Sequence, residues 1–131
     1  MQMIRIYATS VLVDDQEKAL KFYTEVLGFV KKTEVRVGEY KWLTVVSQKE
    51  QSGVELLLEP MGFEPAKAYQ KALKDAGIPY TSFAVDNLNE EYERLTSLGV
   101  EFSVPPTEMG PVMMAVLDDT CGNNIQLIEM L

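Results

Sequence analysis

The chain has 131 residues, 47% of them hydrophobic, which is enough to fill the core of a single domain without disulfides or structural metal. Its formal net charge of −8 repels phosphate backbones and anionic membrane surfaces, so we expect neither nucleic acid nor a membrane as a partner. The absence of histidine excludes Ser-His-Asp and Cys-His catalysis, histidine-based zinc sites and the two-histidine-one-carboxylate iron site.

The first half of the chain predicts four strands and one helix. A β-branched, apolar segment at 4–13 predicts a strand, and the aspartates that follow it are natural caps for a helix beginning near Gln16. That helix has apolar residues at three- and four-residue steps, and Gly28 ends it. Three strand-like segments follow, separated by turn-forming residues, at 30–37, 40–47 and 54–59. The predicted order is therefore β-α-β-β-β.

The same order recurs in the second half. Residues 80–85 predict a strand, 88–98 an amphipathic helix, and the last three strands are expected at 101–104, 112–117 and 124–129. Three pairs of segments lie at nearly equal spacing: Val13-Asp14-Asp15 with Val85-Asp86-Asn87, Leu27-Gly28 with Leu98-Gly99, and Glu55-Leu56 with Gln126-Leu127. We interpret the chain as two copies of one module.

A connector helix is predicted between the copies, opened by Glu64-Pro65 and closed by Gly77 and Pro79. We thus predict an α+β fold in a single domain spanning residues 1–131. Its parts are module one at about 4–60, the connector helix at about 64–77 and module two at about 80–131. The alternative is a ferredoxin-like α+β fold, which requires the repeated order to arise by chance.

Two segments resemble a known family. The stretch from Val11 to Phe29, with its Phe22-Tyr23 pair, resembles the opening signature of the vicinal oxygen chelate superfamily, the group of glyoxalases, bleomycin resistance proteins and extradiol dioxygenases. The stretch from Asp118 to Glu129 resembles the family's Asp-Pro-Asp-Gly-Asn turn and last strand, although Thr120-Cys121 departs from it. The resemblance implies curved mixed sheets around a cup that binds small molecules, commonly completed in a homodimer.

The resemblance also implies four metal-ligand positions. Glyoxalase relatives hold one divalent cation with one side chain from each of four strands, and these positions fall on Ala8, Glu55, Tyr80 and Gln126. Ala8 has no donor atom, Tyr80 would have to lose a phenolic proton of reference pKa about 10, and Gln126 offers a neutral carbonyl. Only Glu55 is a carboxylate, so we expect no divalent metal and no other cofactor.

The remaining candidate residues suggest ligand binding, and the alternative for Glu55 is a hydrogen-bonded remnant of the ancestral site that has no chemical role. Glu55, in an alternating strand, would be a desolvated carboxylate facing the cup, and Tyr80 and Gln126 would complete a polar cluster. Aromatic and methionine side chains could line the cavity, and the candidates are Tyr7, Tyr40, Trp42, Phe83, Met113 and Met114. For each of these six residues, an ordinary core position is the alternative.

Three functions stay open. The first is metal-independent binding of a polar or cationic small molecule in the cup of a homodimer. The second is catalysis of a lyase or dioxygenase-like reaction with Glu55 as general base or as a metal ligand. The third is a non-catalytic interaction protein. A Glu55→Gln variant separates the first two, because an enzyme would keep its affinity and lose its turnover.

The sequence also predicts the compartment. No apolar run approaches the roughly 18 residues needed to cross a bilayer, and the N-terminal residues lack the basic and apolar regions of a signal peptide. Cys121 is the single cysteine and cannot form an intrachain disulfide. Without an imidazole to activate this thiol, we expect it to be inert, and we expect the protein to be cytoplasmic.

Overall fold

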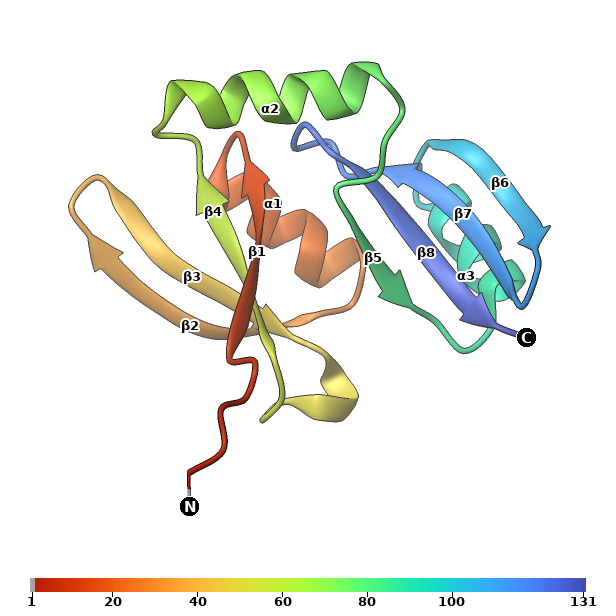
Figure 1. The fold of residues 1–131 in the computed structure, drawn as a ribbon, viewed down its shortest axis with the longest axis horizontal. Helices are drawn as coiled ribbons and strands as arrows, with labels where there is room; N and C mark the ends of the chain where they lie inside the picture. The colour runs from red at the N-terminus through yellow and green to blue at the C-terminus, as the bar shows by residue number, and fades with distance from the viewer. Residues whose placement is uncertain (1) are drawn as a thin grey trace. The chain divides into compact units, whose positions relative to one another are not determined.

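The computed structural model describes residues 2–131, in which the chain forms two compact units. The first unit ends at Met61 and the second comprises Gly62–Leu131. Each unit contains a four-stranded mixed sheet and the helix of one β-α-β-β-β module, as Figure 1 shows. The connector helix belongs to the second unit. The predicted α+β class and the tandem modules are therefore confirmed.

The first unit has the sheet order β1-β4-β3-β2, in which β1 is parallel to β4 and the other neighbours are antiparallel. Its elements are β1 (Ala8–Val13), α1 (Gln16–Lys21), the π-helical turn η1 (Phe22–Val26), β2 (Val30–Val37), β3 (Tyr40–Val46), the 3-10 turn η2 (Gln48–Glu50) and β4 (Glu55–Pro60).

The second unit repeats this plan in the order β5-β8-β7-β6, with β5 parallel to β8. Its elements are α2 (Glu64–Asp75), β5 (Thr81–Ala84), α3 (Leu88–Ser97), β6 (Phe102–Met109), β7 (Val112–Asp118) and β8 (Asn124–Met130).

In the first unit, one face of the sheet packs against α1 and η1. The Asp15 carboxylate caps α1 by accepting a hydrogen bond from the Lys18 backbone N–H at 3.1 Å. The helix then buries its apolar stripe against every second residue of the strands. Fully buried side chains in this core include Val11, Val13, Ala19, Tyr23, Leu43, Val45 and Leu58. The opposite face of the sheet is free of a helix within this unit and is called here the first open face.

The first sheet opens between β3 and β4, which pair at only two positions. Gln16 bridges the gap: its Nε2 donates to the carbonyls of Lys41 at 2.8 Å and Leu58 at 2.9 Å, and its Oε1 accepts from the Lys41 N–H at 3.1 Å. These bonds pair backbone groups that the strand ladder leaves unpaired. The β2–β3 hairpin consequently extends away from β4, as Figure 1 shows.

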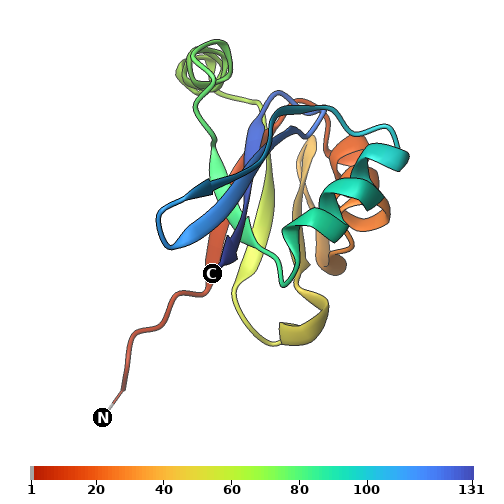
Figure 2. The ribbon, with the colours of Figure 1, turned by 90° about the vertical axis from the view of Figure 1, so that its right-hand side faces the viewer.

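In the second unit, α3 covers one face of the sheet, as Figure 2 shows. The helix buries Leu88 and Leu95, and the Glu129 carboxylate on β8 accepts a hydrogen bond from the Leu88 N–H at 2.7 Å. That bond places Glu129 on the α3 side of β8. By alternation, Gln126, Ile128 and Met130 point to the other side, called here the second open face.

The connector helix α2 is fixed to the turn between β7 and β8. The Gln70 side-chain N–H donates to the Cys121 carbonyl at 3.2 Å and to Asn123 Oδ1 at 3.1 Å. Gly122 in this turn has φ +102°, and a Cβ there would lie 2.8 Å from the Gln70 amide atoms. Because of both conditions, glycine is the residue that fits beneath Gln70. Cys121 is fully buried in the same turn.

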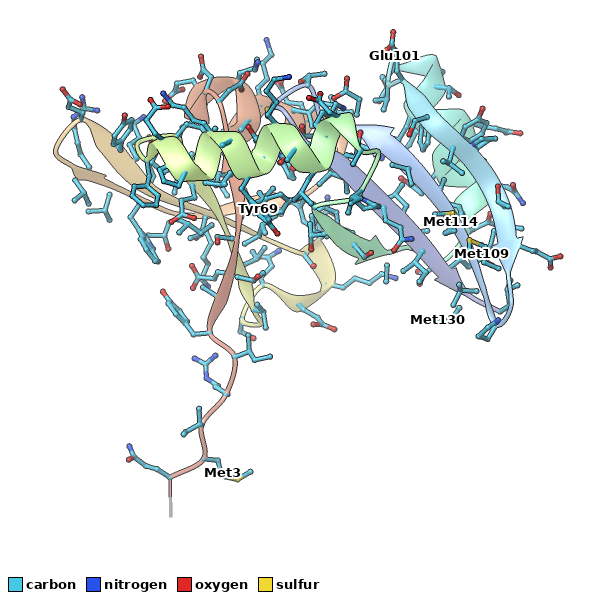
Figure 3. All side chains as sticks on the ribbon, turned by 45° about the horizontal axis from the view of Figure 1, so that its top comes forward. Met3, Tyr69, Glu101, Met109, Met114 and Met130 are labelled. Atoms are coloured by element: carbon cyan, nitrogen blue, oxygen red, sulfur yellow. The ribbon has the colours of Figure 1, made fainter. Side chains whose placement is uncertain are left out.

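Two predicted strands have bounds that are wrong by more than one residue. The strand predicted at 4–13 begins at Ala8, because its partner β4 begins at Glu55, directly opposite Ala8, and the ladder ends with the bond from the Glu55 N–H to the Tyr7 carbonyl. In Figure 3 Met3 lies on a segment that projects from the start of β1. The strand predicted at 101–104 extends to Met109, and register shifts around Pro105 and Pro106 let the edge strand pass two residues without an N–H.

No helix formed by residues 2–131 is long and apolar enough to cross a membrane.

Candidate functional site

Glu55 lies on the first open face as a buried carboxylate. It is the first residue of β4, and the strand alternates so that Leu56 and Leu58 belong to the buried core. Only 7% of Glu55 is exposed. Its direct neighbour on β1 is Ala8, whose methyl group gives the carboxylate no hydrogen-bond partner.

Hydroxyl groups are the side-chain partners of Glu55. Its Oε1 accepts a hydrogen bond from Thr44 Oγ1 at 2.7 Å and a longer one from Thr33 Oγ1 at 3.4 Å. These two threonines face each other across β2 and β3. Within the described chain, no lysine or arginine forms an ion pair with Glu55. A buried carboxylate normally has a cationic partner, so this arrangement leaves Glu55 able to bind one.

The second oxygen of the same carboxylate is open to a ligand. Glu55 Oε2 accepts no hydrogen bond from residues 2–131. It also retains contact with solvent, because no fully buried side-chain nitrogen or oxygen in the described range lacks a partner. Thr44 thus fixes Glu55 through Oε1, and Oε2 is exposed to solvent and can accept a hydrogen bond from a ligand.

An exposed apolar surface adjoins this carboxylate. Trp42 lies two residues before Thr44 on β3, so both side chains project to the first open face. Trp42 is 38% exposed. It belongs to the hairpin face, a set of cross-strand pairs on the part of β2–β3 that extends beyond β4: Val35 with Trp42, and Val37 with Tyr40. The first open face therefore combines an aromatic platform with a carboxylate.

Two lysines of this hairpin, Lys31 and Lys41, form ion pairs on its other side. Lys41 Nζ contacts Glu17 Oε1 of α1 at 2.6 Å and Glu34 Oε2 at 2.7 Å, and Lys31 Nζ contacts Glu34 Oε1 at 2.7 Å. The hydrogen bonds from Lys31 and Lys41 lower the pKa of Glu34 to about 2. The hydrogen bonds that Lys41 donates to the Glu17 and Glu34 carboxylates raise the pKa of Lys41. Because their charges are used here, these lysines do not neutralise Glu55.

In the second unit, Gln126 pairs with Ser82. The two residues are directly opposite on β8 and β5, and the Ser82 hydroxyl donates to Gln126 Oε1. Tyr80, which the repeat places at the position of Ala8, lies two residues earlier and donates its N–H to the Asn124 carbonyl at 2.8 Å. Its ring meets the ring of Tyr69 on α2 edge-to-face, with centroids 6.2 Å apart. Tyr69 is labelled in Figure 3.

The other predicted lining residues are distributed over both faces. Tyr7 precedes β1, its carbonyl accepts from the Glu55 N–H at 2.9 Å, and the Arg5 guanidinium lies 6.0 Å from its ring centroid. Met113 pairs with Glu129 and therefore lies on the α3 side of β7, whereas Met114 points to the second open face. Phe83 pairs with Leu127 of the buried core.

Residues at the family's metal-ligand positions do not fit a metal ion. Ala8 contributes a methyl group, and Gln126 Oε1 already accepts the Ser82 hydroxyl. Among residues 2–131, no three or more Asp, Glu or Cys side chains are grouped so that they could hold an ion. Zinc and iron sites need three or more such donors, or imidazoles, which this chain lacks. No metal-assisted step is therefore derived from these positions.

The sequence did not identify three polar residues of the first and second open faces. They are Thr33, Thr44 and Ser82. Thr44 is fully buried in β3, where it lies between Leu43 and Val45. A hydroxyl between such apolar residues needs a hydrogen-bond partner, and this was the available signal. Which partner it has depends on the β3–β4 register, which no local pattern specifies.

Comparison with known proteins gives one consistent family. The family model of the Glyoxalase/Bleomycin resistance protein/Dioxygenase superfamily matches residues 5–127. The uncharacterized protein YurT of Bacillus subtilis (strain 168) is 50% identical over 126 residues, which are 96% of this chain and 99% of YurT. The crystal structure of UcmS2 is 30% identical with a TM-score of 0.83, covering 98% of this chain and 99% of UcmS2.

A further solved structure shares the fold. TnmS3, an antibiotic binding protein from Streptomyces sp. CB03234, is 24% identical with a TM-score of 0.76, covering 100% of this chain and 99% of TnmS3. The family match spans nearly all of the chain, and it confirms the family resemblance found in the first and last segments of the sequence. The chain belongs to the Glyoxalase/Bleomycin resistance protein/Dioxygenase superfamily.

Proposed function

We propose that the protein is a cytoplasmic small-molecule-binding protein that acts without a catalytic metal and takes its ligand on the first open face. The ligand presents a protonated amine to Glu55 and a planar apolar part to Trp42. The observation that carries the proposal is the Glu55 carboxylate itself, which is 7% exposed, bonded to Thr44 and Thr33 through one oxygen, and without a basic partner in residues 2–131.

Electrostatics favours a cationic ligand over a neutral one. A hydrogen bond to a charged group contributes about 1.5–3 kcal/mol, roughly twice that of a neutral pair. The flat indole of Trp42 adds a surface for stacking or for a cation–π contact. The net charge of −8 raises the local concentration of cations around the protein. For an anionic ligand the electrostatic contributions are lost or reversed, and only the stacking on Trp42 remains.

The family fold supports binding as the activity. TnmS3 has this fold and is an antibiotic binding protein, so the fold is compatible with small-molecule binding. The ligand class proposed for this chain comes from its own Glu55 and Trp42.

We also propose that the protein forms a homodimer. Besides Trp42, which takes the ligand, the hairpin face exposes Val35, Val37 and Tyr40, and apolar surface of this kind is typical of interaction sites. Native mass spectrometry of the untagged protein tests the subunit number, and a monomer at micromolar concentration would contradict this part of the proposal. Elemental analysis of the same sample tests the absence of metal.

The binding proposal can be tested with two matched probes. 1-Naphthylmethylamine is a cation at neutral pH, and 1-naphthalenemethanol has the same ring system without the charge. Isothermal titration should show that the amine binds about tenfold more tightly, which is what a charge-assisted hydrogen bond provides. Glu55→Gln should bring the amine down to the affinity of the alcohol.

The control variant is Glu101→Gln, which removes one negative charge from an exposed position of the second unit. It should leave the preference for the amine unchanged. Equal affinity of the two probes for the unmodified protein would contradict the proposal. A general base at Glu55 would give another pattern, in which Glu55→Gln keeps substrate affinity and loses turnover.

A further inference from the structure

The β3–β4 ladder of the first sheet cannot continue as far as Lys41. Its last pair towards the hairpin is Thr44 with Leu57. In the same register, Lys41 would lie opposite Pro60. Proline has no backbone N–H, so β4 offers no donor to the Lys41 carbonyl at this point. The β2–β3 hairpin therefore needs another support where it leaves β4.

Gln16 supplies that support from the first turn of α1. Its Nε2 donates to the Lys41 carbonyl at 2.8 Å and to the Leu58 carbonyl at 2.9 Å. Its Oε1 accepts from the Lys41 N–H at 3.1 Å. One side chain thus pairs both backbone groups of Lys41 and joins β3 to β4. Gln16 is half-buried, so water competes less well for these bonds than at an exposed position.

Glu17 adds a second contact to the same residue. Its Oε1 lies 2.6 Å from Lys41 Nζ, and we call the contacts of Gln16 and Glu17 with this residue the Lys41 clamp. The Glu17 side chain is 72% exposed, so its ion pair contributes little, and Gln16 provides most of the clamp. Trp42 is the next residue of β3, and Glu55 is on β4. The clamp therefore joins the two strands that carry the proposed ligand contacts.

We propose that Gln16 is a positioning residue that selects ligands by length. By fixing Lys41, it holds Trp42 at a set separation from Glu55, and this separation determines which spacing between ammonium group and flat apolar part is bound. Two groups held rigidly discriminate in this way, because a ligand of another length must lose one contact or be strained. Gln16 does not touch the ligand, since α1 packs on the opposite face of the sheet. The inference rests on the proposed function and adds its specificity-determining residue.

Three amines with one ring system test the selection: 1-naphthylmethylamine, 2-(1-naphthyl)ethylamine and 3-(1-naphthyl)propylamine. Isothermal titration of the unmodified protein should show one length binding about tenfold more tightly than another, because a mismatch costs a charge-assisted hydrogen bond. Gln16→Ala should bring the three affinities to within about twofold of each other, because Trp42 is then free to adjust its separation from Glu55. Equal affinities in the unmodified protein, or a full length preference in Gln16→Ala, would overturn the inference.

The position of Trp42 can also be followed without a ligand. Trp42 is the single tryptophan, so labelling with 5-fluorotryptophan gives one ¹⁹F signal. Gln16→Ala should shift this signal, and the Lys41 amide should exchange with deuterium about tenfold faster because its acceptor is lost. The Val45 amide, within the intact β3–β4 ladder, is the internal control for exchange. An unchanged ¹⁹F signal would show that Gln16 does not position Trp42.

Three further variants separate positioning from general loosening. Gln16→Glu keeps an acceptor for the Lys41 N–H but cannot donate to the two carbonyls when ionised, so it should lose the length preference as Gln16→Ala does. Glu17→Gln removes the exposed ion pair and should reduce the preference less. Gln48→Ala is the matched control, because Gln48 Nε2 donates to the Gly28 carbonyl at 2.7 Å away from the hairpin. An equal loss of preference in Gln48→Ala would overturn the inference.

This inference and the proposed function fail in different ways. If the naphthyl amine and alcohol bind equally to the unmodified protein, Glu55 does not take a cation and the proposed function fails. If the amine is preferred and Gln16→Ala keeps the length preference, the proposed function stands and only the role of Gln16 is overturned.

Discussion

The two units share an order of elements, yet their open faces differ in chemistry. In the first unit, Glu55 and Thr44 place a carboxylate beside the aromatic hairpin face. In the second, Gln126 and Ser82 place an amide beside methionines and aliphatic residues. The helix-facing sides are more alike, since each contains fully buried aliphatic residues under one helix. Two copies of a module can thus keep the same pattern of buried residues under the helix while the residues of their open faces differ in charge and polarity.

The strand registers differ as well. Ala8 is directly opposite Glu55 in the first sheet, whereas Ser82, and not Tyr80, is opposite Gln126 in the second. The spacing of the sequence repeat would have paired Tyr80 with Gln126. A repeat in sequence therefore locates equivalent strands, and it does not determine which residues of two strands are neighbours.

The largest effect on stability is expected in the turn between β7 and β8. This turn packs against the connector helix α2, and the first unit has no such helix among its described elements. Gly122→Ala should lower the free energy of unfolding by about 2–3 kcal/mol, because alanine is strained at φ +102° and its Cβ would displace the Gln70 amide. Urea unfolding at neutral pH measures the change. The control is Gly38→Ala in the first unit, where φ is +63° and the added Cβ has nothing within 4 Å. An equal loss in both variants would show that backbone strain alone is responsible.

A smaller effect on stability is expected when the hydroxyls that bond to Glu55 and Gln126 are removed. Thr44→Val should cost about 2 kcal/mol, because it removes a donor to a buried carboxylate. Ser82→Ala should cost about 0.5 kcal/mol, since Ser82 is exposed and water replaces its bond to Gln126. Thermal and urea unfolding of both variants provide the comparison. Equal costs would mean that Glu55 is no better shielded from solvent than Gln126.

The smallest effect is a dependence on pH that originates in the first unit. The pKa of Glu34 is lowered from 4.5 to about 2 by Lys31 and Lys41. A lowered folded-state pKa means that Glu34 adds stability above the unfolded value, and that this contribution is lost as the pH falls from 4.5 towards 2. The difference in urea midpoint between the unmodified protein and Glu34→Gln should therefore shrink over this range. Glu39→Gln at the hairpin turn is the control for charge removal. A difference that stays constant with pH would show that the carboxylate has no stabilising ion pairs.

Local patterns predicted most of the secondary structure. The bounds of β2 were predicted as observed, and the helix beginning at Gln16 is correct, although its last turn widens to the π-helical η1. The errors at residues 4–7 and in β6 arise from pairing, because a strand exists only where it has a partner. The roles of Glu55, Trp42, Tyr7, Tyr80, Met113 and Gln126 in ligand binding stay predictions, as do the single domain, the homodimer and the absence of a metal.

The sequence by itself determined the element order and the tandem modules, because caps, alternation and helical periodicity depend on residues close in the chain. The family was indicated by the resemblance of its first and last segments to known members. Tertiary structure alone decided that Thr44 meets Glu55, that Ser82 meets Gln126, and that Met113 and Met114 belong to opposite faces. These relations depend on register and on which face a helix covers. Both are set by contacts between residues far apart in sequence, where shifting a strand by one residue exchanges its two faces.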